Sequence, residues 1–138
     1  MVESSDLLKA LQDQKDWNKT FVFTSTKEMI AYRNGQLKPE EIEFYVNAFN
    51  DRDTTVGEGF FVDGEHFDVH RFHPPLIYGR RGGPDDGEGI AIARCKPKQP
   101  KGEEEHWFLL ITYLLPILSA KAVPQMVKFC EANIGNTE

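Results

Sequence analysis

The sequence predicts an α+β fold in which helices lie across a twisted antiparallel sheet, and three observations support this prediction. A hairpin and a helix follow the first helix, a run of about five short strands fills the middle of the chain, and an amphipathic helix closes it. Strands joined by short turns pair antiparallel, and helices that punctuate such a run pack on the faces of the sheet. The 138 residues fit one domain, which we place over residues 1–138.

The first third of the chain predicts two helices around a hairpin. Residues 5–12 have the apolar stripe of an amphipathic helix, and residues 20–25 and 29–32 are two strands joined by a polar turn. Pro39, with acidic residues behind it, suits the first turn of a second helix, because proline fixes φ and acids favour the positive helix end. We expect residues 51–55 to form a polar turn after this helix.

The rest of the chain predicts strands and a closing helix. A glycine- and charge-rich loop is expected over residues 79–89, and the polar excursion Lys96–Glu105 is expected to be the most mobile segment. The last helix covers at least residues 124–133 and ends at Gly135; a start at Ser119 would place Pro124 inside it. The predicted strands are residues 60–62, 66–72, 76–78, 90–94 and 107–114.

Charge excludes one class of function and leaves another open. A net charge of −6 argues against nucleic-acid binding, which needs a basic face. The basic residues are nonetheless clustered, which suits a docking surface for an acidic partner; a set of solvated, functionally silent charges is the alternative. The cluster consists of Arg71, Arg80, Arg81, Arg94, Lys96, Lys98 and Lys101.

The cysteines and the hydropathy pattern predict a cytoplasmic protein. Cys95 and Cys130 match no metal-ligand spacing, and we expect two reduced, buried thiols. The N terminus lacks the positive charge and apolar core of a signal peptide. The longest apolar run, Trp107–Leu118, is too short to span a bilayer.

The sequence gives little support to the hypothesis that this protein is an enzyme. His66, Asp68 and His70 would share one face of a strand, where they could ligate a transition metal. Solvent-facing polar residues on a half-buried sheet give the same alternation of polar and apolar side chains, and we favour this interpretation. The glycine-rich loop lacks the lysine–serine ending of a phosphate-binding loop, and no nucleophile elbow is present. We therefore expect no enzyme activity, no metal and no cofactor.

Six segments taken in order resemble the profilin family from about Phe21 to the C terminus. They are LKPEEIEFYVNAF, GFFVDGEHFDVHRF, LIYGRRGG, EGIAIARC, HWFLLITY and LLPILSAKAVPQMVKFCEANI. Each shares only a few identities with profilins, which indicates a divergent microbial member, an actin-encoding archaeon being one candidate source. The resemblance implies a central sheet of about six to seven strands, with the N- and C-terminal helices on one face and a shorter helix on the other.

The resemblance also implies a function and a binding face. Profilins bind monomeric actin at its barbed face, block nucleation, tune nucleotide exchange and supply monomers to filament ends. Their actin face combines the later strands with the first half of the C-terminal helix. For Val69 and Ile92 a core position is the alternative, and for Lys128 a solvated one. Carried over by position, the actin-binding candidates are Val69, Arg71, Arg80, Arg81, Ile92, Arg94, Lys121, Gln125 and Lys128.

The chain departs from the family where profilins bind polyproline. The first helix has no aromatic residue and the C terminus lacks the usual tyrosine, so we expect weak or absent polyproline binding. Trp17 and Phe129 are weak substitutes for the missing platform. The basic cluster suggests phosphoinositide headgroups as a further partner. We expect the protein to be a monomer. The alternative to actin binding is a profilin-shaped scaffold or signalling module that binds peptides, proline-rich partners or phosphoinositides and does not bind actin.

Overall fold

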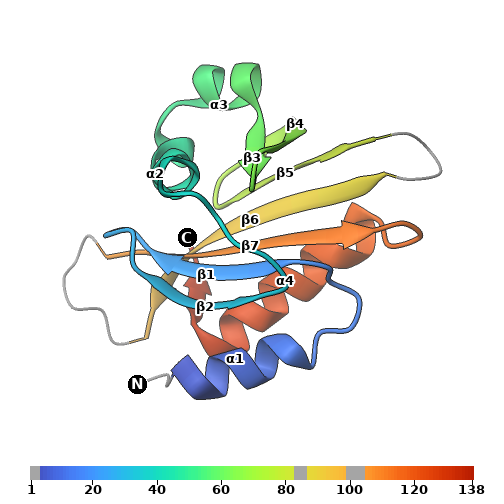
Figure 1. The fold of residues 1–138 in the computed structure, drawn as a ribbon. Helices are drawn as coiled ribbons and strands as arrows, with labels where there is room; N and C mark the ends of the chain where they lie inside the picture. The colour runs from blue at the N-terminus through green and yellow to red at the C-terminus, as the bar shows by residue number, and fades with distance from the viewer. Residues whose placement is uncertain (1–3, 83–86, 99–104) are drawn as a thin grey trace.

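The computed structural model describes residues 4–82, 87–98 and 105–138, and it consists of one antiparallel sheet with helices on both faces (Figure 1). Seven strands follow the order β2-β1-β7-β6-β5-β4-β3, and a short eighth strand, β8, pairs with β6. The elements are α1 (Ser4–Gln12), β1 (Thr20–Thr24), β2 (Met29–Arg33), α2 (Pro39–Asn47), η1 (Ala48–Asn50), α3 (Arg52–Glu58), β3 (Phe60–Val62), β4 (Glu65–His73), β5 (Leu76–Arg81), β6 (Glu88–Pro97), β7 (Trp107–Leu114), α4 (Ser119–Asn133) and β8 (Gly135–Thr137).

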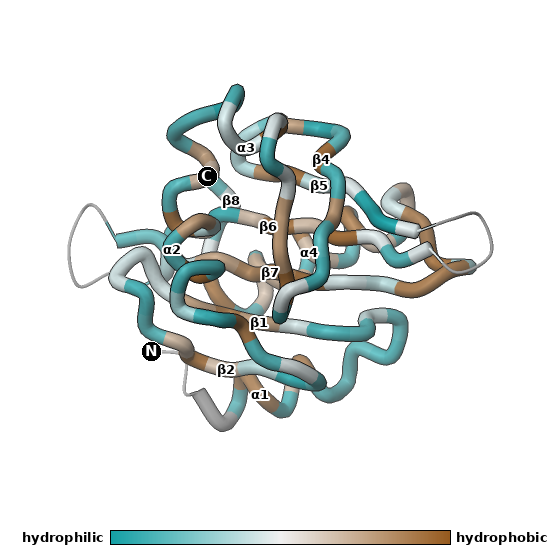
Figure 2. The backbone as a smooth tube through the Cα atoms, turned by 45° about the horizontal axis from the view of Figure 1, so that its top comes forward, coloured by the Kyte–Doolittle hydropathy of each residue, from teal (hydrophilic) through white to brown (hydrophobic). Residues whose placement is uncertain are grey.

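Each face of the sheet has its own hydrophobic core. Helices α1 and α4 cover one face, whereas α2 and η1 cover the other (Figure 1). The strands alternate between the two cores: in β6, Ala91 and Ala93 face α4, and Ile90 and Ile92 face α2. Strands buried on both sides are hydrophobic for most of their length, as β7 is in Figure 2. The predicted α+β class and the predicted placement of the helices are both confirmed.

Small residues on β6 make room on the α4 side. A Cβ at Gly89 would lie 2.1 Å from the ring of Tyr113, the residue opposite it on β7. The Tyr113 hydroxyl in turn is 2.7 Å from the Ser119 hydroxyl at the start of α4. Gly89 therefore allows the tyrosine to lie flat across β6 and to reach the helix.

Two predicted loops contain regular structure. The expected turn at residues 51–55 is the start of helix α3, capped by Asp51, whose Oδ1 accepts a 3.1 Å hydrogen bond from the Thr54 N–H. The expected loop at residues 79–89 is mostly strand, because β5 continues to Arg81 and β6 begins at Glu88. Residues 83–86 of that loop, and residues 99–104 of the excursion predicted to be mobile, lie outside the described residues.

The C-terminal segment extends beyond its predicted helix. Helix α4 begins at Ser119, with Pro124 inside it at an exposed position where solvent can satisfy the carbonyl that loses its donor. Gly135 opens β8 rather than only ending the helix. A Cβ there would lie 1.8 Å from the Lys96 carbonyl oxygen, so only glycine allows β8 to pair this closely with β6.

The two cysteines are free and buried, as predicted. Cys95 and Cys130 both belong to the core beneath α4. The hydrogen bond with Cys95, together with burial, raises the pKa of Cys130, so this thiol stays protonated and unreactive at neutral pH. Within the described ranges, no helix is long and apolar enough to cross a membrane.

Candidate functional site

A groove with basic walls lies where α3, the β4–β5 hairpin and α4 meet. Its volume is about 410 Å³. We call it the basic groove, because its eight lining residues include two arginines and two histidines and none of them is acidic. The lining residues are Arg52, His70, Arg71, Phe72, His73, Leu76, Tyr78 and Val123.

A bulge in β4 produces this arrangement. Val69 pairs with Gly79, whereas Arg71 pairs with Tyr78, so His70 is an extra residue without a partner of its own in β5. The bulge reverses the alternation of β4. As a result Arg71 projects on the Tyr78 side, next to α4, while Phe72 packs in the core beneath α2.

The two arginines of the groove are available to a partner. Arg71 is exposed, and within the described ranges it has no acidic residue within 4.0 Å. Arg52, at the start of α3, makes only a 3.6 Å contact with its exposed neighbour Asp53. Sequence reasoning missed Arg52 because it predicted a turn at this point. The signal that could have found it is the spacing of Asp51 and Thr54, which suits a helix cap.

Arg80 and Arg81 were predicted together but project from opposite faces of β5. Arg80 pairs with Gly89 and lies on the α4 side, near Tyr113. Arg81 lies on the α2 side, where its guanidinium is 5.5 Å from the Phe67 ring centroid. The two arginines therefore cannot belong to one continuous contact on one face of the sheet.

Arg81 is held in an internal ion-pair network. Its Nη2 is 2.8 Å from Glu88 Oε1 and 3.0 Å from Glu65 Oε2. Glu88 is only 1% exposed and also accepts a 2.8 Å hydrogen bond from Asn18. Burial raises the pKa of Glu88, but hydrogen bonds from Thr112, Asn18 and Arg81 outweigh it and bring the net pKa below its usual value. Glu88 is therefore an ionised, internally paired carboxylate.

Three further candidates also lie on the α2 side of the sheet. Val69 and Ile92 are 7% and 0% exposed and belong to the core beneath α2. Arg94 stacks 4.9 Å from the Phe49 ring centroid, and its Nε donates a 2.7 Å hydrogen bond to the Glu138 carbonyl oxygen. Val69 and Ile92 are core residues, and Arg94 contacts Phe49, whose ring lies 6.5 Å from that of the groove residue Phe72.

The helix candidates lie on the flank of α4 that faces away from the groove. At 100° per residue, Lys121, Gln125 and Lys128 share one flank, and Val123 lies on the other. Gln125 donates a 2.9 Å hydrogen bond to Asp16 and accepts a 3.3 Å bond from the Trp17 indole N–H. The hydrogen bonds from Gln125 and Lys121 lower the pKa of Asp16. Val123 lines the groove, but the sequence analysis missed it, because an apolar helix residue is expected to lie in the core.

The two aromatic residues considered for polyproline binding are core residues. Trp17 and Phe129 are 2% and 4% exposed, and their rings meet edge to face with centroids 5.4 Å apart. A polyproline platform needs exposed ring faces. Neither residue offers one.

The histidines predicted on one strand have separate environments. His66 Nε2 is 2.8 Å from the Glu58 carbonyl oxygen, and its Nδ1 is 3.9 Å from Asp68. His70 lines the basic groove instead. In the part of the chain that the structure describes, no three histidine, cysteine, aspartate or glutamate residues converge as a metal site requires.

Comparisons with known proteins identify the fold and the family. The structure is similar to profilin II of Acanthamoeba castellanii (TM-score 0.69, 16% identity, covering 94% of this chain and 91% of that one). It is also similar to the profilin of Schizosaccharomyces pombe (TM-score 0.64, 21% identity, 94% and 88% covered) and to rat profilin 2a (0.63, 14%, 91% and 92%). A search of curated protein sequences found no match. The family model described as Profilin matches residues 5–98, and the chain therefore belongs to the profilin family of non-enzymatic, actin-binding proteins.

Proposed function

We propose that this protein binds monomeric actin through the basic groove and in this way regulates polymerisation in the cytoplasm. The observation that carries the proposal is the pair Arg52 and Arg71, which line the groove together with apolar side chains and, among the described residues, have no close acidic partner other than Asp53. On a chain with a net charge of −6, such a surface selects a partner with acidic groups around an apolar contact.

The chemistry of the groove suits a protein interface. The half-buried Tyr78 and Val123 supply an aromatic and an aliphatic contact, and the exposed arginines supply charge. Binding hot spots favour aromatic residues and arginine, and rim charges mainly accelerate encounter. Arg80, two residues from Tyr78 on the same face of β5, is the next candidate contact. Binding there would suppress nucleation and deliver monomers to filament ends.

Only some of the positions carried over from the family lie in or beside the basic groove. Arg71 and Arg80 stay in the actin-binding set, and Arg52, Tyr78 and Val123 join it. The positions on the far face of the sheet are assigned structural roles. The three on the other flank of α4 are assigned to the contact with residues 16–17 or to solvent.

Pyrene-actin polymerisation tests this assignment. Wild-type protein should slow spontaneous assembly in a dose-dependent manner, and Arg52→Glu/Arg71→Glu should weaken actin binding by about tenfold or more. Lys9→Glu/Lys15→Glu makes the same change of net charge at exposed positions elsewhere and should behave like the wild type. If both double variants lose activity equally, net charge rather than the groove is responsible.

The same variants address the other partners. If wild-type protein leaves an actin from its own source unaffected, a scaffold or signalling role replaces the proposal. Phosphoinositide binding would use the same arginines, so vesicle sedimentation of Arg52→Glu/Arg71→Glu measures it directly. Buried Trp17 and Phe129 support the expectation of weak or absent polyproline binding.

A further inference from the structure

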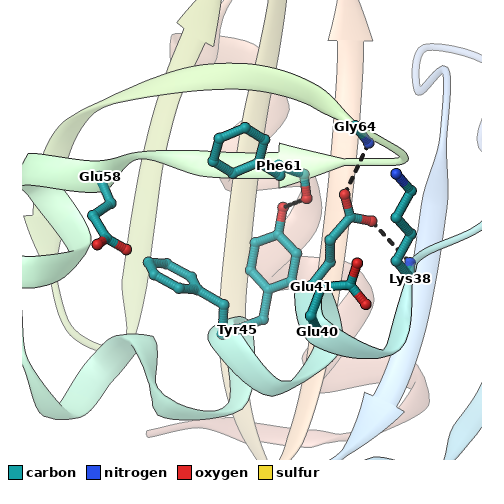
Figure 3. A pocket seen from close by; sticks show the side chains of 8 residues that line it. Lys38, Glu40, Glu41, Tyr45, Glu58, Phe61 and Gly64 are labelled. Atoms are coloured by element: carbon teal, nitrogen blue, oxygen red, sulfur yellow. Dashed lines mark hydrogen bonds between the residues drawn. The ribbon is translucent and has the colours of Figure 1, made fainter.

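A second pocket, different in chemistry from the basic groove, lies between α2, the end of α3 and the β3–β4 hairpin (Figure 3). Its volume is about 360 Å³. We call it the aromatic–acidic pocket. Its lining residues are Lys38, Glu40, Glu41, Phe44, Tyr45, Glu58, Phe61 and Gly64.

The walls of this pocket are fixed by buried hydrogen bonds. The Glu41 carboxylate, 6% exposed, accepts bonds of 2.8 to 2.9 Å from the backbone N–H groups of Lys38, Asp63 and Gly64. The Tyr45 hydroxyl donates a 2.7 Å bond to the Phe61 carbonyl oxygen. Burial raises the pKa of Tyr45 well above its usual value, so the hydroxyl remains a donor. The pocket is therefore preformed.

Two phenylalanines leave part of their rings uncovered here. Strand β3 alternates, so Phe60 is buried and Phe61 projects outward with 44% of its surface exposed. The Phe61 ring contacts His66 at a centroid distance of 4.9 Å. Phe44 is half-buried and touches Phe60 edge-on at 6.3 Å. Exposed aromatic faces are attractive to cations as well as to apolar groups.

The carboxylates beside these rings are unpaired. The Glu41 carboxylate accepts three hydrogen bonds from backbone N–H groups. Glu40 and Glu58, in contrast, have no ion pair and no side-chain hydrogen bond within the described ranges. In Figure 3, Glu58 lies at one end of the pocket, and Lys38, the only cation in its lining, lies at the other.

The acidic surface continues along α2. A neighbouring groove of about 420 Å³ shares Glu40 and Phe44 with the pocket and adds Glu43 and Asp51. Its lining contains no basic residue. Because two adjoining hollows share one aromatic side chain, the surface suits an extended chain rather than a compact small molecule.

We propose that the aromatic–acidic pocket binds an arginine-containing basic segment of a protein partner. A guanidinium stacks on the exposed rings of Phe44 and Phe61 and pairs with Glu58, and the next basic residue of the segment reaches Glu40. Arginine fits better than lysine, because its planar, weakly hydrated group stacks on aromatic rings and bonds carboxylates in a bidentate manner. This interaction is separate from actin binding, since no residue lines both this pocket and the basic groove.

An NMR titration with a hexa-arginine peptide tests the proposal. The backbone amides of Phe44, Glu58, Phe61 and Gly64 should shift in a saturable way. Glu40→Gln/Glu58→Gln should weaken binding by about tenfold, the loss of two charge-assisted contacts, and Phe61→Ala by about threefold to fivefold, the loss of one cation–aromatic contact.

A matched control separates the pocket from the general acidity of the chain. Asp13→Asn/Glu131→Gln removes two exposed carboxylates far from α2 and should change the affinity less than twofold. An equal loss in the control, or shifts confined to residues outside both the pocket and the adjoining groove, would overturn the proposal. The spectra show whether each variant is folded, and all of them should still slow pyrene-actin assembly if the basic groove is the actin site.

Discussion

The arginines of strands β4, β5 and β6 fall into two groups, which lie on opposite faces of the sheet. On the α2 side, Arg81 and Arg94 are held by carboxylates, carbonyl groups and aromatic rings of the protein itself. On the α4 side, Arg71 has no such partner among the described residues, and Arg52 at the start of α3 has only its exposed neighbour Asp53, 3.6 Å away. A basic cluster in the sequence can therefore contain both internally paired arginines and unpaired ones, and the unpaired ones are those that we propose for recognition.

The largest expected effect comes from Arg81. Arg81→Gln leaves the buried Glu88 carboxylate without its main cationic partner and should lower the free energy of unfolding by about 3 kcal/mol. Arg71→Gln, the matched change on the other side, should stay within about 0.5 kcal/mol of wild type. Urea denaturation followed by tryptophan fluorescence measures both. Equal stability of the two variants would break the comparison.

The second effect is a dependence on pH. Because the folded-state pKa of Glu88 lies below its ordinary value of 4.5, its contribution to stability is complete above pH 4.5 and is lost as pH falls through the folded-state pKa. Urea midpoints measured from pH 7 to pH 3 should therefore fall less steeply in Glu88→Gln than in the wild type. Parallel curves would mean that other acids account for the whole acid sensitivity.

A smaller loss is expected from Arg94. Arg94→Gln removes the contact with the Phe49 ring and the bond to the Glu138 carbonyl oxygen, which together are worth about 1 kcal/mol. Actin binding should be unchanged, because Arg94 is not among the residues that line the basic groove. Reduced actin affinity at unchanged stability would mean that Arg94 contacts actin directly.

The smallest effect is predicted for Lys121, which pairs with Asp16 at 3.1 Å on the solvent side of α4. Lys121→Gln should leave both the urea midpoint and the actin affinity unchanged within error, because exposed ion pairs contribute little. A clear loss of actin affinity would extend the binding surface around α4 to the flank that includes Gln125 and Lys128.

Most of the fold was predictable from local patterns. The alternation in the strands, the proline-led start of α2 and the apolar stripe of the first helix are signals carried by neighbouring residues. Helix α3 and strand β8 were missed for different reasons. Residues 52–58 are largely polar and lack an apolar stripe, and β8 depends on a close approach between Gly135 and β6 that no local pattern reveals.

The candidate site was less predictable than the fold, because its composition depends on register. The bulge at His70 decides which face Arg71 occupies, and its position is set by the pairing with β5. Likewise, Arg80 and Arg81 could be assigned to opposite faces only once the expected loop was known to be a strand. The arginines of the strands were found by composition, but Arg52 was missed, and the separation of the strand arginines into two groups required the structure of the sheet.

The short helix α3 sets the distance between the two binding surfaces. Arg52 at its start lines one, Glu58 at its end lines the other, and seven residues of α-helix span about 10 Å. A partner bound at either end therefore lies close to the other surface, and a slender peptide in the aromatic–acidic pocket leaves room for a larger partner in the basic groove. Because the length of α3 fixes this spacing, the size of the two partners, and not only their affinity, decides whether both surfaces can be occupied at once.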